Sequence, residues 1–455
     1  MLIFDIADYA IRERNRSLSD DVLHHAKRAI IDWCAATAPG SEAMPAAGLV
    51  KALNEDIGRG GSRLFPSGTP ATLRAAAIIN GAASHTVEFD DIFRDALYHP
   101  GAPVISAALA AAETEALGGA GFLRAVVIGY EISTRIALVM GRSHYKYWHN
   151  TATNGSFGAA AAVAAVLNLD RDRFANAIAL AGTMAAGLQQ SLRGDSHAKP
   201  MHAAHAAETG VLSALSAAHG VSGASDILEG EVGFGAAMSE GCDWSLATNG
   251  LGEDYNITRM TFKNHGCCGH AFAAIDGALA LSNQHQFDPA DILNIRVDGY
   301  SATVDICGSN THATPYEGRF SVPYLVATAL THGSARLDAF TEARLTDPAT
   351  TALTAKVDVR LDDEIDAEFP GRRAARLCIK MRDGSVLEHY QKTRRGDPDM
   401  PLTDDELEDK FMELTGPVMG EKASIGLLDA CLSLETLGSV RDLPKVGPLS
   451  AVQSA

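Results

Sequence analysis

The sequence is poor in aromatic residues and in positive charge. Phe, Trp and Tyr make up 6% of its 455 residues, and 38 Lys and Arg stand against 56 Asp and Glu, for a formal net charge of −18. Nucleic acid and anionic lipid both bind to positive surface fields, so we expect neither as a partner. An anionic substrate would need a local cluster of Lys, Arg and His, which makes the few basic residues informative.

Cysteine is also scarce. The seven cysteines lie at positions 34, 242, 267, 268, 307, 378 and 431, too few and too scattered for a disulfide scaffold, so a reducing cytoplasm is expected. Cys267 and Cys268 are adjacent and therefore cannot act as a CxxC clamp on zinc or as a CxxC redox pair. Packing or pocket-wall positions are expected for both.

Long apolar runs are missing. Residues 159–167 form an alanine-rich stretch, but a bilayer span takes about 20 apolar residues, so no membrane helix is expected. The first 15 residues mix apolar side chains with Asp, Arg and Glu and therefore predict a mature helix, not a targeting leader.

Helical periodicity dominates the chain. From residue 5 to about 263, apolar residues recur at three and four positions, and the segment 72–91 is predicted as one continuous helix. The sequence GRGGS at 58–62 is interpreted as a turn. The fold class predicted is mainly α.

Near residue 290 the pattern changes. Segments 292–300, 355–363 and 375–390 alternate apolar and polar residues as half-buried strands do, and a helical pattern at 321–333 lies between the first two. A helical pattern returns towards the carboxyl end of the sequence. The final tail is expected to be frayed. We therefore predict a discontinuous helical domain, residues 1–265 and 400–455, and an inserted α+β domain, residues 266–399.

The segment HTVEFDDIFRDALYHPG carries the first candidate site. His85, Glu88 and Asp91 follow i,i+3 spacing, which would place them on one helical face, and His99 comes after a turn. A carboxylate and a histidine could meet there. The alternative is a helix whose acids favour the positive end of its dipole.

Two further segments carry basic or phenolic groups. Tyr145 and His149 are four residues apart, so they would stack on one face of a helix, and either could act as general acid or base; the alternative is a hydrogen-bonded core histidine. Lys199, His202 and His205 follow i,i+3 spacing, and Pro200 suits a first helical turn. These three could receive an anion at a helix amino terminus, or form a solvated basic edge.

Lys263 and Arg319 are the remaining candidates. Lys263 stands at the junction of the two predicted domains, where pockets are common, and Arg319 could hold a carboxylate through two parallel N–H bonds. Surface ion pairs are the alternative for both.

Several chemistries lack their motifs. The pair His202 and His205 does not have HExxH spacing, so no metal is expected. Neither GxSxG, nor GxGxxG after a strand, nor GxxxxGK[ST] occurs, which leaves hydrolase, dehydrogenase and nucleotide hydrolase readings without support.

Seven ordered segments resemble the MmgE/PrpD family between about residues 5 and 448. They are NGAASHTVEFDD, the HPG turn, SHYKYWHNTATNGSFGAA, HAKPMHAAHAAETG, the Lys263 to Cys267-Cys268 motif, GRFSVPY and RRGDP. The family includes 2-methylcitrate dehydratase, cis-aconitate decarboxylase and iminodisuccinate epimerase.

The resemblance implies a discontinuous all-helical domain, an inserted domain related to chorismate mutase, and an active site between them in a homodimer without metal or cofactor. By motif position, His99, His149, Lys199 and Lys263 match residues that surround the anionic substrate in the decarboxylase and dehydratase branches. Tyr145 lies in the same motif as His149.

The sequence departs from those branches at two positions. Glu88 stands where they usually carry Asp, and Ile92 stands where they usually carry Thr, which removes a polar contact to substrate or leaving group. These departures argue against a strict dehydratase or decarboxylase. From the resemblance we expect an enzyme that removes a proton beside a carboxylate of a small polycarboxylic acid, in the first place a dehydratase-like lyase. An epimerase and a decarboxylase stay open, as does a catalytically inactive binding or assembly protein of the same fold.

Overall fold

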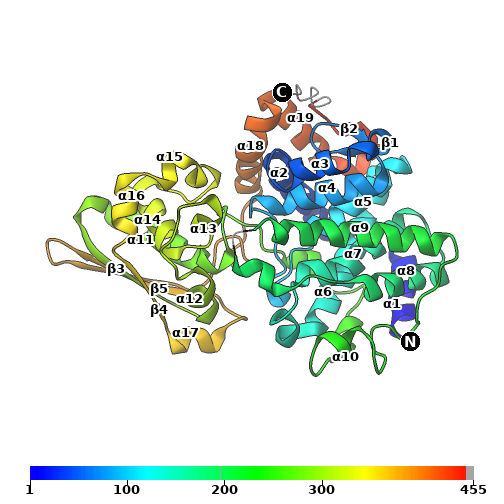
Figure 1. Ribbon diagram of the computed structural model, residues 1–455, viewed down its shortest axis with the longest axis horizontal. Coiled ribbons are helices and arrows are strands. Elements are labelled where there is room, and N and C mark those ends of the chain that lie inside the picture. Colours follow the sequence, from blue (N-terminus) through cyan, green and yellow to red (C-terminus); the bar gives the residue numbers. More distant parts are fainter. Residues whose placement is uncertain (195, 447–455) are drawn as a thin grey trace. The chain divides into compact units, whose positions relative to one another are not determined.

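The computed structural model describes residues 1–194 and 196–446, which form two compact units. The helical unit comprises residues 1–86, 90–260 and the chain from Thr403 on, and the inserted unit comprises residues 87–89 and 261–402. The frayed tail expected from the sequence lies, from residue 447 on, outside the described residues. The prediction of a mainly α fold with a smaller α+β part is confirmed (Figure 1).

Helices build nearly all of the helical unit. Their bounds are α1 Leu2–Arg14, α2 Asp20–Gly40, α3 Ala46–Ala52, α4 Leu73–Thr86, α5 Gly101–Thr114, α6 Gly119–Tyr145, α7 Asn150–Val166, α8 Arg171–Met184, α9 Ala198–Ala218, α10 Phe234–Met238, α18 Asp404–Met419 and α19 Glu421–Leu432. The helical periodicity of the sequence predicted most of them, because one apolar stripe per helix faces the core.

The glycine-rich segment at 58–62 was wrongly predicted as a turn. Strands β1, Ile57–Leu64, and β2, Thr69–Ala71, pair as an antiparallel hairpin, and the GRGGS sequence that suggested a turn lies inside β1. The register shifts between Ile57 and Ser62, and Gly58 and Gly60 have positive φ angles of 80° and 97°. A strand interrupted by such an irregularity shows no period of two in its sequence, so the pattern could not reveal it.

Small residues set the spacing of the central helices. A Cβ atom on Gly129 of α6 would lie 2.7 Å from the carbonyl oxygen of Gly158 in α7, and one on Gly210 of α9 would lie 2.3 Å from Cβ of Ala159, also in α7. Both distances are below van der Waals contact, so only glycine permits these approaches. The alanine-rich composition therefore produces a tightly packed bundle core.

The carboxyl-terminal helices pack beside an amino-terminal helix of the same unit, as Figure 1 shows for α18 and α2. Helix α18 begins with a capping box, in which Thr403 and Glu406 exchange backbone and side-chain hydrogen bonds. Lys410 of α18 donates to Asp32 of α2 at 2.5 Å, and the two side chains are 0% and 1% exposed. This buried ion pair joins chain segments 378 residues apart.

The inserted unit contains a four-stranded sheet of order β4-β3-β5-β6, in which β3 and β4 are parallel and the other pairs are antiparallel. Helices α11 and α14 pack against it over a core that includes Phe272, Ile295, Leu325 and Leu377 (Figure 1). The strand prediction is confirmed. Bounds are β3 Ile292–Gly299, β4 Val357–Leu361, β5 Ala375–Met381, β6 Val386–Gln391, α11 Phe272–His285, α12 Ser301–Cys307, α13 Pro315–Arg319, α14 Val322–His332, α15 Glu342–Leu345, α16 Pro348–Thr354 and α17 Asp363–Glu368.

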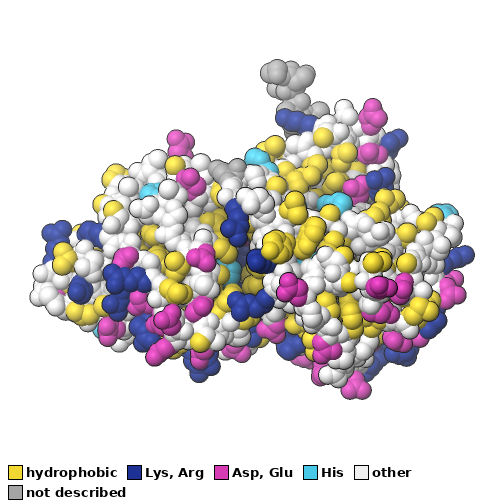
Figure 2. Space-filling model, turned by 60° about the horizontal axis from the view of Figure 1, so that its bottom comes forward, with side chains coloured by type: hydrophobic (Ala, Val, Ile, Leu, Met, Phe, Trp, Pro, Cys, Tyr) yellow, Lys and Arg dark blue, Asp and Glu magenta, His cyan; other side chains and the backbone are white. Residues whose placement is uncertain are grey.

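The surface carries charges of both signs. On the face drawn in Figure 2, Lys and Arg side chains are interspersed with Asp and Glu. Among the described residues, no helix has both the length and the apolar character needed to cross a bilayer.

Replacing Lys410 with Met should destabilise the helical unit by about 3–5 kcal/mol, because Asp32 would keep its buried charge without the partner. Urea unfolding followed by tryptophan fluorescence measures this unit selectively, since Trp33, Trp148 and Trp244 all belong to it. Arg171→Met removes a solvent-exposed pair with Asp8 and is the control, expected to change little. Equal effects of the two substitutions would contradict the structural role given to the Asp32–Lys410 pair.

Candidate functional site

Four histidines of the helical unit lie together, and we call them the imidazole cluster: His85, His99, His149 and His202. His85 is in the last turn of α4, His99 lies just before α5, His149 directly precedes α7, and His202 is in α9. Ring centroids are 4.8 Å apart for His85 and His99, 5.8 Å for His85 and His149, and 5.2 Å for His149 and His202. Four separate helical segments thus bring their imidazoles into one row.

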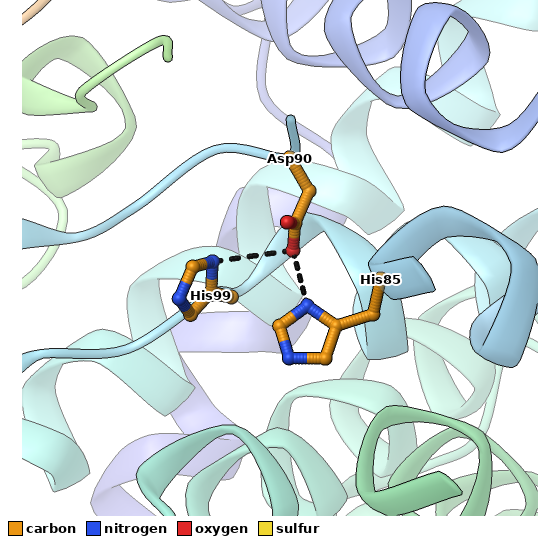
Figure 3. Close-up of side chains that lie close together, drawn as sticks. All are labelled: His85, Asp90 and His99. Atoms are coloured by element: carbon orange, nitrogen blue, oxygen red, sulfur yellow. Dashed lines mark hydrogen bonds and ion pairs between the residues drawn. The ribbon is translucent and has the colours of Figure 1, made fainter. Parts of the chain in front are cut away.

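A buried carboxylate joins one end of the row. Oδ2 of Asp90 lies 2.6 Å from Nδ1 of His85 and 3.2 Å from Nδ1 of His99, as drawn in Figure 3. At the other end, Nδ1 of His149 and Nδ1 of His202 are 3.0 Å apart. One nitrogen of that last pair must donate and the other accept, so these two rings cannot both be protonated at Nδ1.

Burial keeps part of the cluster uncharged. It lowers the pKa of His149 well below the usual value, and positive charge on His85, His202 or His99 whenever these rings are protonated, together with the charge of Lys199, lowers it further. For His202, burial followed by the fields of His85, His205 and Lys199 lowers the pKa to about 4. Both rings are therefore neutral at pH 7 and able to accept a proton.

Helix α9 brings a cation to the same region. Lys199 and Pro200 lie in its first turn, as the sequence predicted, and the Lys199 side chain is buried. Lys199 is close enough to lower the pKa values of both His149 and His202. His205 lies further along α9, where its Nε2 is 3.4 Å from the carbonyl oxygen of Met184 and from Oγ1 of Thr209. Of the three predicted basic residues, His202 is a member of the row and Lys199 lies close to it.

The prediction that His85, Glu88 and Asp91 share one helical face is wrong. Helix α4 ends at Thr86, and Glu88 has a φ of 58°, in the left-handed region that terminates helices. Residues 87–89 pack with the inserted unit, whereas His85 and Asp91 belong to the helical unit. No feature of the sequence pattern marks this departure.

Asp91 has a different environment from that expected. Its Oδ1 accepts the backbone N–H of Gly101 at 3.0 Å, at the first residue of α5, and its Oδ2 accepts the Tyr130 hydroxyl at 2.8 Å. A Cβ on Gly101 would approach Oδ1 to 2.7 Å, so glycine is required there. Burial raises the pKa of Asp91 well above its usual value. Asp91 therefore fixes the start of α5, next to His99, through bonds within the protein.

The expected stacking of Tyr145 and His149 on one helix is also wrong. Helix α6 is kinked at Gly141, whose φ is 61°, and ends at Tyr145, while His149 precedes α7. His149 instead faces His85 and His202. Tyr145 is half-buried.

The inserted unit contains its own group of charged residues. Nζ of Lys263 lies 3.0 Å from Oε2 of Glu88, and both side chains are buried. Burial lowers the pKa of Arg319, and the opposing field of Glu88 shows that this carboxylate is near. The guanidinium of Arg319 lies over the ring of Phe340, and Cys267 and Cys268 are buried in the adjoining core, as predicted. Glu88, Lys263 and Arg319 thus form a second cluster, defined within this unit alone.

A metal ion would find ligands at one place among the described residues. One ligand atom from each of His85, Asp90 and His99 lies within 4.8 Å of the others. The sequence analysis considered metal binding only at His202 and His205, and expected no metal there. Asp90 was missed altogether, and its position beside Asp91 in the DD pair was the only available signal.

Comparison with known families identifies the chain's relatives. Residues 4–247 match the MmgE/PrpD N-terminal domain, and residues 265–434 match the MmgE/PrpD C-terminal domain. The chain belongs to the MmgE/PrpD family. The resemblance seen in the sequence is therefore confirmed.

Three relatives of this MmgE/PrpD protein carry related names. It is 27% identical to the cis-aconitate decarboxylase-like protein oryM of Aspergillus oryzae, over 96% of this chain and 95% of that protein. It is 26% identical to the cis-aconitate decarboxylase of Aspergillus terreus, over 96% and 94%. For the cis-aconitate decarboxylase of Homo sapiens the identity is 25%, over 80% of this chain and 76% of that protein.

The His202 environment predicts how the stability of this MmgE/PrpD protein depends on pH. Because the folded pKa of about 4 lies below the ordinary value of about 6.5, the unfolded chain binds more protons between these pH values. The free energy of unfolding should therefore fall as the pH drops through this window, and less so in His202→Gln. Urea unfolding at pH 7 and pH 5, followed by tryptophan fluorescence, measures the difference. His219→Gln, at the exposed end of α9, is the control and should retain the wild-type slope.

Replacing Glu88 with Gln should weaken the inserted unit by about 3–5 kcal/mol, because Lys263 would lose its buried carboxylate partner. Hydrogen exchange of peptides from β3 and β5, measured by mass spectrometry, reports this unit directly. Glu388→Gln, on the exposed side of β6, is the matched control. The double variant Glu88→Gln/Lys263→Met should recover part of the loss, and exchange rates equal to those of the control in Glu88→Gln would refute the role of the pair.

Proposed function

We propose that this chain is an enzyme that transfers a proton at the carbon beside a carboxylate of a small di- or tricarboxylic acid, and that it acts as a lyase without cofactor or metal. The observation that carries the proposal is the imidazole cluster beside buried Lys199. Neutral buried imidazoles supply proton acceptors, and a buried cation at a helix amino terminus attracts an organic anion.

We assign a role to each residue of the proposed site from its charge. Lys199 holds a substrate carboxylate, and this contact grows stronger as negative charge develops on the substrate in the transition state. His99 or His149 exchanges the proton with carbon. Tyr145 and Lys263 complete the proposed catalytic set, and His202, His205, Arg319 and Glu88 are proposed substrate-binding residues, on the grounds of motif resemblance. We do not assign Asp91 to the substrate, since both its oxygens accept bonds from Gly101 and Tyr130.

The candidate reaction from the sequence is dehydration. A base removes the proton from carbon, the electron pair forms the double bond, and hydroxide leaves with a proton from a second acid as water. The names of the relatives favour a second candidate, decarboxylation, in which the C–C bond breaks, carbon dioxide leaves, and an acid delivers a proton to the carbon that retains the electron pair.

Epimerisation uses the same proton transfer with nothing leaving. Ile92, buried and without a hydroxyl where the dehydratase and decarboxylase branches usually carry Thr, favours a reaction that does not need this polar contact. We further propose that the protein is a cytoplasmic homodimer, as its family resemblance implies. An inactive binding protein is the alternative outside enzymology.

Proton NMR in deuterium oxide tests the function. The wild-type protein, incubated with cis-aconitate, 2-methylcitrate and iminodisuccinate separately, should change at least one of them. New vinyl signals with loss of sp³ signals indicate elimination, loss of carbon dioxide with deuterium incorporation indicates decarboxylation, and exchange without net change indicates epimerisation. His149→Gln should lower the rate by about 10²- to 10⁴-fold, because it removes a proton acceptor.

His219→Gln is the control for that substitution and should keep the full rate. A panel of di- and tricarboxylates that all remain unchanged and unexchanged, with correctly folded wild-type protein, would reject the enzyme proposal in favour of a binding protein. Equal rates in His149→Gln and His219→Gln would exclude His149 as the proton acceptor, and equal rates in His99→Gln as well would move the chemistry away from the imidazole cluster.

A further inference from the structure

One buried carboxylate of the helical unit contacts two members of the imidazole cluster at once. Asp90 presents the same oxygen, Oδ2, to Nδ1 of His85 and to Nδ1 of His99 (Figure 3). Asp90 and His85 are fully buried, and the His99 side chain is 12% exposed. The carboxylate is therefore shielded from water, and its hydrogen bond to His85 and its charge beside His99 decide how these rings carry their protons.

An ionised carboxylate can only accept hydrogen bonds. Nδ1 of His85 is hydrogen-bonded to this carboxylate at 2.6 Å, so it is the protonated nitrogen of that ring. Nδ1 of His99 lies 3.2 Å from the same oxygen without the geometry of a hydrogen bond, but a lone pair at that place would face the carboxylate charge, so protonation at Nδ1 is favoured there too. In a neutral ring the lone pair then resides on Nε2. Asp90 thereby selects, for each of the two histidines, the tautomer in which Nε2 is the base.

The remaining contacts of His85 agree with a neutral ring. Its Nε2 has no hydrogen-bond partner among the described residues. A second N–H at that place would be a buried, unpaired donor, which destabilises the charged form of the ring. The parallel ring of His149 next to it, 22° from the plane of His85, is held neutral as well.

We propose that Asp90 is a positioning residue that fixes His99 and His85 as Nδ1–H tautomers, so that Nε2 of His99 is the proton acceptor of the site. The catalytic meaning of this arrangement rests on the function proposed above, whereas the tautomer assignment does not. These side chains could hold a metal ion through the two Nδ1 atoms only after both atoms lose their protons, so a metal bound at Nδ1 and the proposed tautomers exclude each other.

The test is nitrogen-15 NMR of protein with labelled histidine side chains, in which the shifts of the two ring nitrogens distinguish Nδ1–H from Nε2–H. His85→Gln and His99→Gln identify the two signals. Wild-type protein should show Nδ1–H for both rings. Asp90→Asn should convert His99 at least partly to Nε2–H, because the amide can present a donor where the carboxylate could only accept. Asp95→Asn, on the exposed part of the same loop, should leave both unchanged.

Three results would overturn the inference: an Nε2–H form of His99 in the wild type, an unchanged pattern in Asp90→Asn, or one equivalent of Zn²⁺ bound by the wild type and lost in Asp90→Asn. The zinc result would make the three residues metal ligands.

With any polycarboxylate that the wild type turns over, Asp90→Asn should lower kcat by about 10²- to 10⁴-fold with KM nearly unchanged, and Asp95→Asn should alter neither. If no polycarboxylate reacts, the proposed function fails while the tautomer result still stands or falls by itself.

Discussion

The burial of closely spaced imidazoles, complete for His85 and His149 and partial for His99 and His202, is the constraint on which the helical unit's chemistry depends. For His149 and His202, burial between alanine-rich helices disfavours the charged form and lowers the pKa, and the nearby charge of Lys199 lowers it further. Glycines such as Gly129 and Gly210 let the helices approach closely enough to achieve this burial. The packing of small residues therefore accounts for the neutral state of these two rings.

Binding of an anion at this site should change the proton affinity of its imidazole rings. The field that lowers the pKa of His149 includes Lys199, and a bound carboxylate near these groups would oppose that field and raise the affinity of the rings for protons. Binding and proton acceptance are thereby coupled, which suits chemistry in which negative charge develops on a substrate carbon. Asp90 fixes which ring nitrogen responds, because its carboxylate lies next to Nδ1 in both His85 and His99.

The sequence predicted the parts of the fold that repeat, and missed those that interrupt a repeat. Helical and strand periodicities located most helices and the four-stranded sheet, since burial of one face imposes them. The irregular strand at 57–64 and the left-handed residue Glu88 leave no periodic signal. The helix was predicted over 72–91, but in the structure it ends at Thr86. Glu88 belongs to the inserted unit, where it pairs with Lys263. Spacing identified most of the imidazole cluster's residues, but not Asp90, whose importance depends on tertiary contacts.

The most direct test of the account is the proton balance of anion binding. Isothermal titration with tricarballylate, a saturated tricarboxylate, in buffers of different ionisation enthalpy at pH 6 measures the protons taken up or released. Burial of neutral imidazoles beside Lys199 predicts binding with net proton uptake, reduced in His202→Gln. Binding with proton release, or uptake that is the same in His202→Gln, would contradict a site made of neutral, anion-responsive imidazoles.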